Sequence, residues 1–134
     1  MSKKKGDRRE RMGRNIFTES GFFVENPNFS RFQNKDFYNL HDFMAVHPRS
    51  KVIFVQVKSG TASGINNYIE ECAERFSAEH TQIFYMVYHK REGWRLIEID
   101  LTDKTRTVIV DERETTNNMG EDVKTYLENK LLSA

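Results

Sequence analysis

The chain has 134 residues, a length typical of one domain, and 37% of the residues are apolar and 31% charged. Ten Phe, five Tyr and one Trp can form a core, which excludes a wholly disordered chain, and no apolar run nears the roughly 18 residues of a membrane span. The net charge is +1, and the single cysteine, Cys72, excludes a disulfide framework and a Cys-rich zinc site. No apolar stretch follows the first lysines, so we expect no secretory signal peptide and an intracellular, cytoplasmic protein.

The positive charge is concentrated near the N-terminus. Residues 1–14 carry seven basic and two acidic side chains, a net of +5, so the rest of the chain carries −4. This asymmetry predicts contact with a polyanion such as nucleic acid, and the alternative is a solvated segment that only aids solubility. We expect residues 1–134 to form a single domain whose residues 1–6 are a flexible basic arm. The side chains expected to contact phosphate here are Lys3, Lys4, Lys5, Arg8 and Arg9.

The first predicted elements are a helix and a short strand. The helix covers residues 7–20, because an apolar stripe that includes Ile16 and Phe17 runs along it, and Gly21 follows as a stop signal. The apolar run over residues 21–25 predicts the first strand.

Residues 26–39 predict a long loop, because Pro and Asn recur there among aromatic and basic residues. Aromatic rings interleaved with cations can stack on bases while the cations contact phosphates, and we expect Arg31 and Lys35 to bind nucleic acid. The alternative is that the aromatic side chains only hold the loop against the sheet.

Two β-rich segments follow, over residues 40–47 and 51–58, with a turn between them. If this hairpin is centred near Arg49, the numbers of paired residues sum to about 98. Asp42 then lies opposite Gln56.

The second half of the chain predicts a helix, three strands and a final helix. The helix over residues 65–79 has one apolar face, which includes Cys72, and Ser63 is its expected N-cap. The resulting order, α-β-β-β-α-β-β-β-α, predicts an α/β fold with one mixed sheet and helices packed on it. The final helix could cover the sheet or form a dimer seam. The last four elements are expected over residues 82–88, 94–101, 105–110 and 122–132.

The hairpin brings three kinds of polar group together. Side chains alternate between the two faces of a strand, so Gln56 and Lys58 share one face, and Asp42 lies opposite Gln56. A carboxylate, an amide and an ammonium group among apolar strand residues cost free energy unless they are paired, which favours a functional role. The alternative is that they are solvated residues of an edge strand, and Asp36 is a second choice for the acidic position.

These residues resemble a known superfamily. Asp42, then Gln56-Val57-Lys58, with Glu10 in the preceding helix, is similar to the PD-(D/E)xK nucleases, and most of all to archaeal Holliday junction resolvases and their small relatives. The resemblance covers roughly residues 5–76. Two positions depart from the pattern: His41 stands where the motif has Pro, and Gln56 stands where it has an acid.

The resemblance implies a restriction-endonuclease-like fold, with an α-β-β-β-α-β core and additional C-terminal strands and a helix. It implies that Glu10, Asp42, Gln56 and the carbonyl of Val57 hold Mg²⁺ or Mn²⁺. Lys58 would stabilise charge that develops on the phosphate, rather than act as a general base. The loop that begins at Ser59 would contact DNA, and the implied assembly is a homodimer.

The leading hypothesis is therefore a metal-dependent, structure-specific DNA endonuclease that resembles the resolvases. One alternative is a nicking or restriction-type nuclease of the same superfamily. Another is a nucleic-acid-binding module that kept the fold but lost cleavage, which Gln56 leaves open because an amide carries no charge. Glu10 also has a purely structural alternative, an ion pair with Arg14 one turn later.

Overall fold

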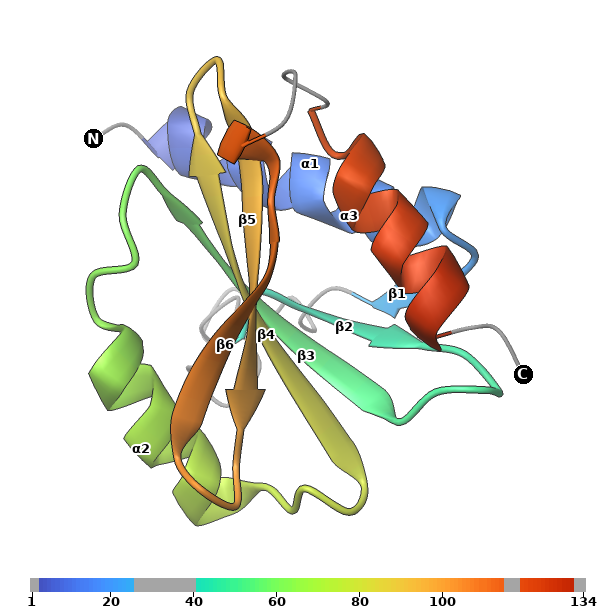
Figure 1. Cartoon of the computed structure of the whole chain (residues 1–134), viewed down its shortest axis with the longest axis vertical. Helices are drawn as coiled ribbons and strands as arrows, with labels where there is room; N and C mark the ends of the chain where they lie inside the picture. The colour runs from blue at the N-terminus through green and yellow to red at the C-terminus, as the bar shows by residue number, and fades with distance from the viewer. Residues whose placement is uncertain (1–2, 26–40, 115–118, 132–134) are drawn as a thin grey trace.

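The structure is a computed structural model, which describes residues 3–25, 41–114 and 119–131. The predicted element order is confirmed, and the chain is an α/β structure with one mixed sheet flanked by helices (Figure 1). The elements are α1 (Lys3–Glu19), β1 (Phe23–Glu25), β2 (Phe43–Val46), β3 (Val52–Ser59), α2 (Ile65–Arg75), β4 (Thr81–His89), β5 (Gly93–Asp100), β6 (Thr105–Asp111), the 3-10 turn η1 (Glu112–Glu114), α3 (Glu121–Tyr126) and the π-helical turn η2 (Leu127–Leu131).

The six strands lie in the sheet in the same order as in the chain, from β1 to β6. Neighbouring strands are antiparallel except β3 and β4, which are parallel. A parallel pair needs a crossover connection, and α2 supplies it. β4 is buried without interruption from Ile83 to His89, as expected for a strand that is covered on both faces.

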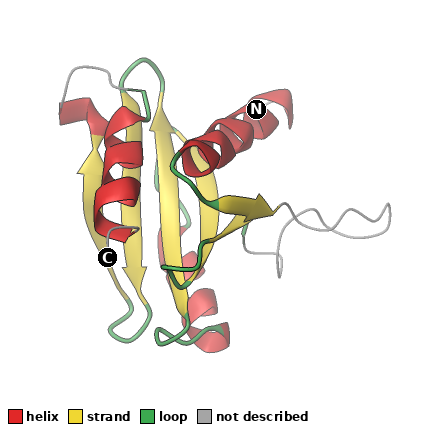
Figure 2. Ribbon diagram, turned by 90° about the vertical axis from the view of Figure 1, so that its right-hand side faces the viewer, coloured by secondary structure: helices red, strands yellow, loops and turns green. Residues whose placement is uncertain are grey.

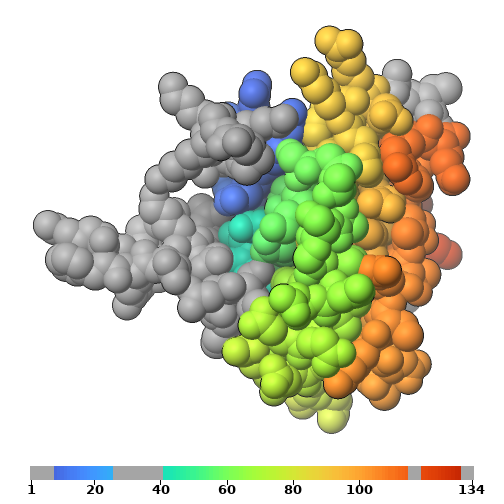
Figure 3. Space-filling view, turned by 90° about the vertical axis from the view of Figure 1, so that its left-hand side faces the viewer, coloured from blue at the N-terminus to red at the C-terminus, as the bar shows by residue number. Residues whose placement is uncertain are grey.

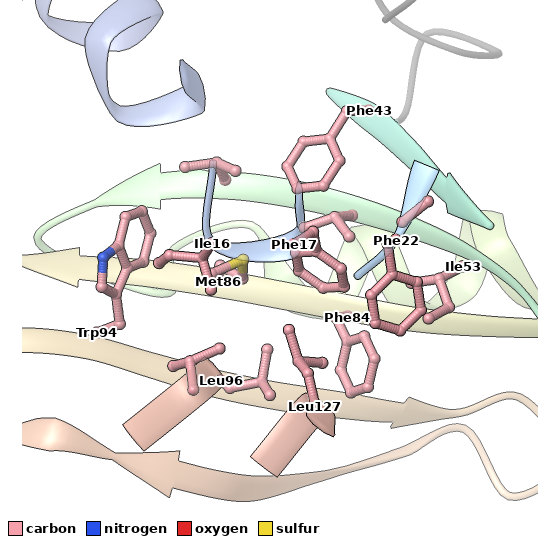
Figure 4. Close-up of a cluster of buried hydrophobic side chains, with 14 of the residues drawn as sticks. Ile16, Phe17, Phe22, Phe43, Ile53, Phe84, Met86, Trp94, Leu96 and Leu127 are labelled. Atoms are coloured by element: carbon pink, nitrogen blue, oxygen red, sulfur yellow. The ribbon is translucent and has the colours of Figure 1, made fainter. Parts of the chain in front are cut away.

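The helices divide between the two faces of the sheet. α1 and α3 lie on one face, and α2 lies on the other (Figure 2). Each face has its own apolar cluster. Figure 4 shows the cluster under α1 and α3, where Phe17 packs edge-on against Phe22 and Phe43 with ring centroids 5.4 Å apart in each pair. The cluster under α2 includes Phe54, Ile69 and Ile97.

α1 packs unusually close to the sheet at Gly13. A Cβ at this position would lie 3.3 Å from Cγ2 of Val57 and 3.5 Å from Cε2 of Phe43, so the missing side chain allows the helix to rest on β2 and β3. The helix begins four residues before the predicted start at residue 7. Residues 3–6, expected to lie in a flexible arm, therefore belong to its first turns.

α2 is shorter than predicted, and its N-cap is different. The helix ends at Arg75 rather than near residue 79, because Phe76 turns to an extended conformation and packs against Phe54. Ser63 is not the N-cap. The chain enters the helix through Gly64, which has a left-handed φ of 81°, while the Ser63 hydroxyl pairs with Thr61.

The C-terminal helical segment covers the sheet, which decides between the two roles expected for it. Val123 and Leu127 are fully buried in the cluster that α1 shares. Before this segment lies Glu112, which is also fully buried. Its carboxylate accepts four backbone hydrogen bonds, from the N–H groups of Trp94 (2.8 Å), Gly120 (2.7 Å), Asp122 (3.1 Å) and Val123 (3.2 Å).

None of the helices in the described ranges is long and apolar enough to cross a lipid bilayer. The predicted loop over residues 26–39, with Arg31, Lys35 and Asp36, lies outside the described residues.

Candidate active site

The hairpin of β2 and β3 has the predicted register. Phe43 pairs with Val55, and Met44 with Phe54, so the numbers of each pair sum to 98. Asp42 lies just before β2 and outside its regular pairing, because its backbone N–H donates over 2.8 Å to the carbonyl of Val55, which already pairs with Phe43. The paired residues of β2 begin at Phe43, so the position of Asp42 opposite Gln56 stays a prediction.

The Asp42 side chain folds onto the backbone of β3. Its Oδ2 accepts a hydrogen bond from the N–H of Val57 over 2.7 Å, and the side chain is half-buried. The negative charge acts on two tyrosines of the α2 face. Burial and then Asp42 raise the pKa of Tyr85 to about 12, and Asp42 also contributes to the raised pKa of the buried Tyr68. The carboxylate thus lies near both tyrosines.

Buried hydrogen bonds connect these tyrosines to their surroundings. The Tyr68 hydroxyl lies 2.7 Å from Nδ1 of His41, and the Tyr85 hydroxyl donates to the carbonyl of Ser63 over 2.8 Å. Burial lowers the pKa of His41 to about 3, so its imidazole is neutral at physiological pH. The two bonds join the residue before Asp42 and the loop before α2 to the same polar region.

Gln56 and Lys58 lie beside Asp42 on the α2 face. Both are half-buried, and both follow the alternation that places Phe54 in the cluster under α2. In the parallel pairing Gln56 aligns with Tyr85, and Lys58 aligns with the next α2-facing residue, Val87. The structure therefore brings together the carboxylate, the amide and the ammonium group that the sequence placed in one patch.

Glu10 approaches from the other face of the sheet. It lies in α1 three residues, about 4.5 Å along the helix axis, before Gly13, which rests on Val57. One residue earlier, the Arg9 guanidinium lies over the ring of Tyr88, 4.1 Å from its centroid. Glu10 itself is half-buried.

The residues expected to contact DNA differ in their surroundings. Arg9 is half-buried and packed on Tyr88, so its guanidinium is partly used within the fold, whereas Arg8 is exposed. The buried Ser59 hydroxyl has no hydrogen-bond partner within the described part of the chain. Lys3, Lys4 and Lys5 begin α1, while Arg31 and Lys35 lie outside the described residues.

The donor atoms at this site suit a hard divalent cation. Within residues 3–25, 41–114 and 119–131 there is no cluster of three or more His, Cys, Asp or Glu side chains. The predicted ligand set contains only two acids, so it depends on amide and backbone oxygens as well. Asp42 already lies against β3 beside Gln56, and carboxylate, amide and carbonyl oxygens are the ligands that Mg²⁺ and Mn²⁺ prefer.

Sequence reasoning missed the residues that surround Asp42. Tyr68 lies on the buried face of α2, but the partner of its hydroxyl comes from a distant segment. Tyr85 lies in the mostly apolar strand β4, and nothing in that strand's sequence indicates that its hydroxyl bonds to the carbonyl of Ser63. Cys72 is buried as expected, and burial raises the pKa of its thiol to about 12, which leaves it protonated.

Comparison with known proteins finds few similarities. No protein-family model matches the sequence, and no curated protein is significantly similar to it. Among solved structures, one that resembles this chain is a Holliday junction resolvase from the archaeal hyperthermophile Archaeoglobus fulgidus. The alignment covers 69% of this chain and 75% of the resolvase, with 14% sequence identity and a TM-score of 0.48.

Proposed function

We propose that this protein is a divalent-metal-dependent endonuclease that hydrolyses DNA phosphodiester bonds, with branched DNA of the Holliday junction type as its substrate. The proposal treats the chain as one nuclease-like domain with a restriction-endonuclease-like fold of the PD-(D/E)xK type. The observation that supports it best is the register of β2 and β3. This register sets Asp42 against the backbone of Val57, with Gln56 and Lys58 on the same face.

In the proposed mechanism, Asp42 and Glu10 supply carboxylate oxygens to Mg²⁺ or Mn²⁺, and Gln56 and the Val57 carbonyl supply neutral oxygens. A bound ion of this kind would acidify a water molecule and offset phosphate charge. Asp42 is already oriented by its bond from the Val57 N–H, which reduces the ordering needed when metal binds. The Lys58 ammonium group would stabilise the negative charge that develops in the transition state.

Gln56 favours a second candidate function. An amide oxygen adds no negative charge, so this site attracts a divalent cation less strongly than one with three acids. A protein with this site could bind nucleic acid without cleaving it. A nicking or restriction-type nuclease is the remaining alternative, since residues around the metal do not define the shape of the DNA.

A cleavage panel tests these proposals. The wild-type protein, Asp42→Asn and the control Asp103→Asn, an exposed turn residue, would be incubated with a four-way junction, a linear duplex and a supercoiled plasmid. Each reaction would contain Mg²⁺, Mn²⁺ or EDTA. We expect metal-dependent cleavage of the junction by the wild type and Asp103→Asn, and none by Asp42→Asn.

Each of the other outcomes has a distinct meaning. Nicking of plasmid without preference for the junction would favour the restriction-type alternative. Binding without cleavage in every metal would favour the non-catalytic module. A homodimer is proposed because a four-way junction presents two symmetric strands, and sedimentation of the protein with and without the junction would test this assembly.

A further inference from the structure

Three polar side chains, Lys58, Arg95 and Asp111, are aligned across the α2 face of the sheet, with the buried Val87 between Lys58 and Arg95. The strand pairings align Lys58 with Val87, Val87 with Arg95, and Arg95 with Asp111. Paired residues point to the same face, and neighbouring strands lie about 4.8 Å apart. The backbone of Arg95 is therefore roughly 10 Å from that of Lys58, in the direction away from Asp42.

The far end of this row is a paired arginine. Both oxygens of Asp111 accept hydrogen bonds from Arg113, at 2.8 Å from Nε and 2.7 Å from Nη2. His89 lies in the same region, because it follows Val87 by two residues in β4 and so faces the same side. We call Lys58, Arg95 and Arg113 the basic row.

Two nitrogens in this region are buried without a partner. Nε of Arg95 and Nε2 of His89 have no hydrogen-bond partner within the described residues. Burial, then Arg113 and Arg95, lower the pKa of His89 below its ordinary value, although Asp111 and Glu92 oppose the shift. The positive potentials of the two arginines thus overlap at His89.

The row lies on a continuous part of the surface. Figure 3 shows the end of β3 and the loop after it in green, the turn between β4 and β5 in yellow, and the end of β6 in orange, all above α2. Arg113 and the turn residues Lys90 and Arg91 are exposed there. A strand of nucleic acid that reaches Lys58 could therefore continue across β4, β5 and β6.

We propose that the basic row binds phosphates of the same nucleic-acid strand beyond the one that Lys58 contacts. This inference rests on the proposed nuclease function, because that function places a phosphate at Lys58. One strand of a duplex carries a phosphate about every 3.4 Å of helix axis, so Arg95 would meet a phosphate about three nucleotides away. Guanidinium groups suit this role, since their planar donors match phosphate oxygens.

DNA affinity measured without cleavage tests the row separately from catalysis. Fluorescence anisotropy with a labelled four-way junction and a labelled duplex, in EDTA and at several salt concentrations, would compare the wild type with Arg95→Gln. We expect affinity to fall about three- to tenfold, and the slope of log affinity against log salt to become shallower by about 1. Arg95→Lys, which keeps the charge, should recover most of the affinity.

Two further variants distinguish binding from a structural effect. Asp111→Asn removes the carboxylate that holds Arg113, so it should strengthen DNA binding, which a merely damaged fold would not do. Arg106→Gln is the matched control, because Arg106 is an exposed arginine at the other end of β6 that contacts Asn66 of α2. Its affinity and salt slope should equal those of the wild type.

The outcomes separate this inference from the proposed function. If Arg95→Gln has the same DNA affinity and salt slope as the wild type, the basic row does not bind phosphates, even if the protein cleaves DNA. Weaker binding by Arg95→Gln in a protein that never cleaves would support the row while the proposed nuclease function fails. Calorimetric titration with inorganic phosphate is a further experiment. Saturable binding of phosphate alone, with the DNA affinity of Arg95→Gln unchanged, would overturn the inference and indicate a site for free phosphate.

Discussion

The carboxylates of Glu112 and Asp42 both accept backbone hydrogen bonds, but in different settings. Glu112 is fully buried, and four N–H groups from β5 and the start of α3 converge on its two oxygens. Asp42 is half-buried, accepts the N–H of Val57, and lies beside an amide and an ammonium group. The first carboxylate joins three parts of the fold, and the second lies where a ligand could reach it.

Burial and hydrogen-bond partners together indicate which role each carboxylate has. A buried carboxylate surrounded by main-chain donors contributes to stability, because removing it leaves those donors unsatisfied. A carboxylate at the edge of a sheet, oriented by one strand and next to other polar side chains, is suited to chemistry. Asp42 and Glu112 should therefore respond to substitution in opposite ways.

The largest effect is expected for Asp42→Asn. If this carboxylate holds the metal, cleavage should fall on the order of 100-fold or more, because the transition state loses charge stabilisation. The midpoint of thermal unfolding should stay close to that of the wild type, since the amide oxygen can still accept the Val57 N–H. Initial cleavage rates on the junction and a thermal melt give the two values. Undiminished cleavage would remove Asp42 from the site.

Glu112→Gln should produce the reverse pattern. The neutral amide keeps one acceptor but directs an NH₂ group at backbone donors, so we expect the free energy of unfolding to fall by about 2–4 kcal/mol. Cleavage per folded molecule should not change. Denaturant unfolding measures the loss, and Glu114→Gln is the matched control, since Glu114 is exposed in the same short turn. Equal stability of the two variants would contradict the role given to Glu112.

The pocket around Glu112 should also reject a side chain at Gly93. A Cβ there would lie 2.7 Å from Cβ of Glu112, and Gly93 has a left-handed φ of 107°. Gly60 has a φ of 84° but no neighbour within 4 Å of its Cβ position. We expect Gly93→Ala to cost about 3 kcal/mol and Gly60→Ala about 1 kcal/mol, because only the first adds a steric clash to the backbone strain. Chemical denaturation of both variants would show whether this ranking holds.

A smaller effect should distinguish the ligands near Asp42. Gln56→Glu adds a charge at nearly constant reach, so Mn²⁺ should bind more tightly, on the order of tenfold. Gln56→Ala should weaken binding without unfolding the sheet. Calorimetric titration of Mn²⁺ into the three proteins gives the affinities. Identical affinities would mean that Gln56 does not bind the metal, and they would strengthen the non-catalytic alternative.

The smallest effect concerns pH and the residue before Asp42. His41 has a pKa of about 3 in the folded state against 6.5 for an ordinary histidine, so the unfolded chain takes up the proton first as pH falls. His41 therefore contributes its full stability above pH 6.5 and loses it progressively toward pH 3, by about 1 kcal/mol per pH unit. Thermal melts between pH 7 and pH 5 should show a weaker pH dependence for His41→Gln. The exposed His80→Gln should follow the wild type.

The local pattern of the chain predicted most of the fold. The alternation of apolar residues and the positions of turn residues indicated the order of helices and strands and the register of the hairpin of β2 and β3. The predicted end of α2, near residue 79, was wrong. Phe76 leaves the helix to pack on His41 and Phe54, neither of which is near it in sequence. Gly64 replaced Ser63 as the N-cap for a similar reason, since the Ser63 carbonyl accepts a bond from Tyr85.

The sequence pattern was sufficient to predict the element order and the register of the hairpin of β2 and β3, because both depend on neighbours within one strand or across one tight turn. The alternation within β3 also predicted that the amide of Gln56 and the ammonium group of Lys58 share one face. Three features depend on tertiary packing: Glu112 is buried and accepts backbone hydrogen bonds, Tyr68 pairs with His41, and Arg95 is aligned with Lys58. These arrangements bring together segments separated by 8 to 37 residues, from Glu112 and Gly120 to Lys58 and Arg95, and no local pattern contains the packing that produces them.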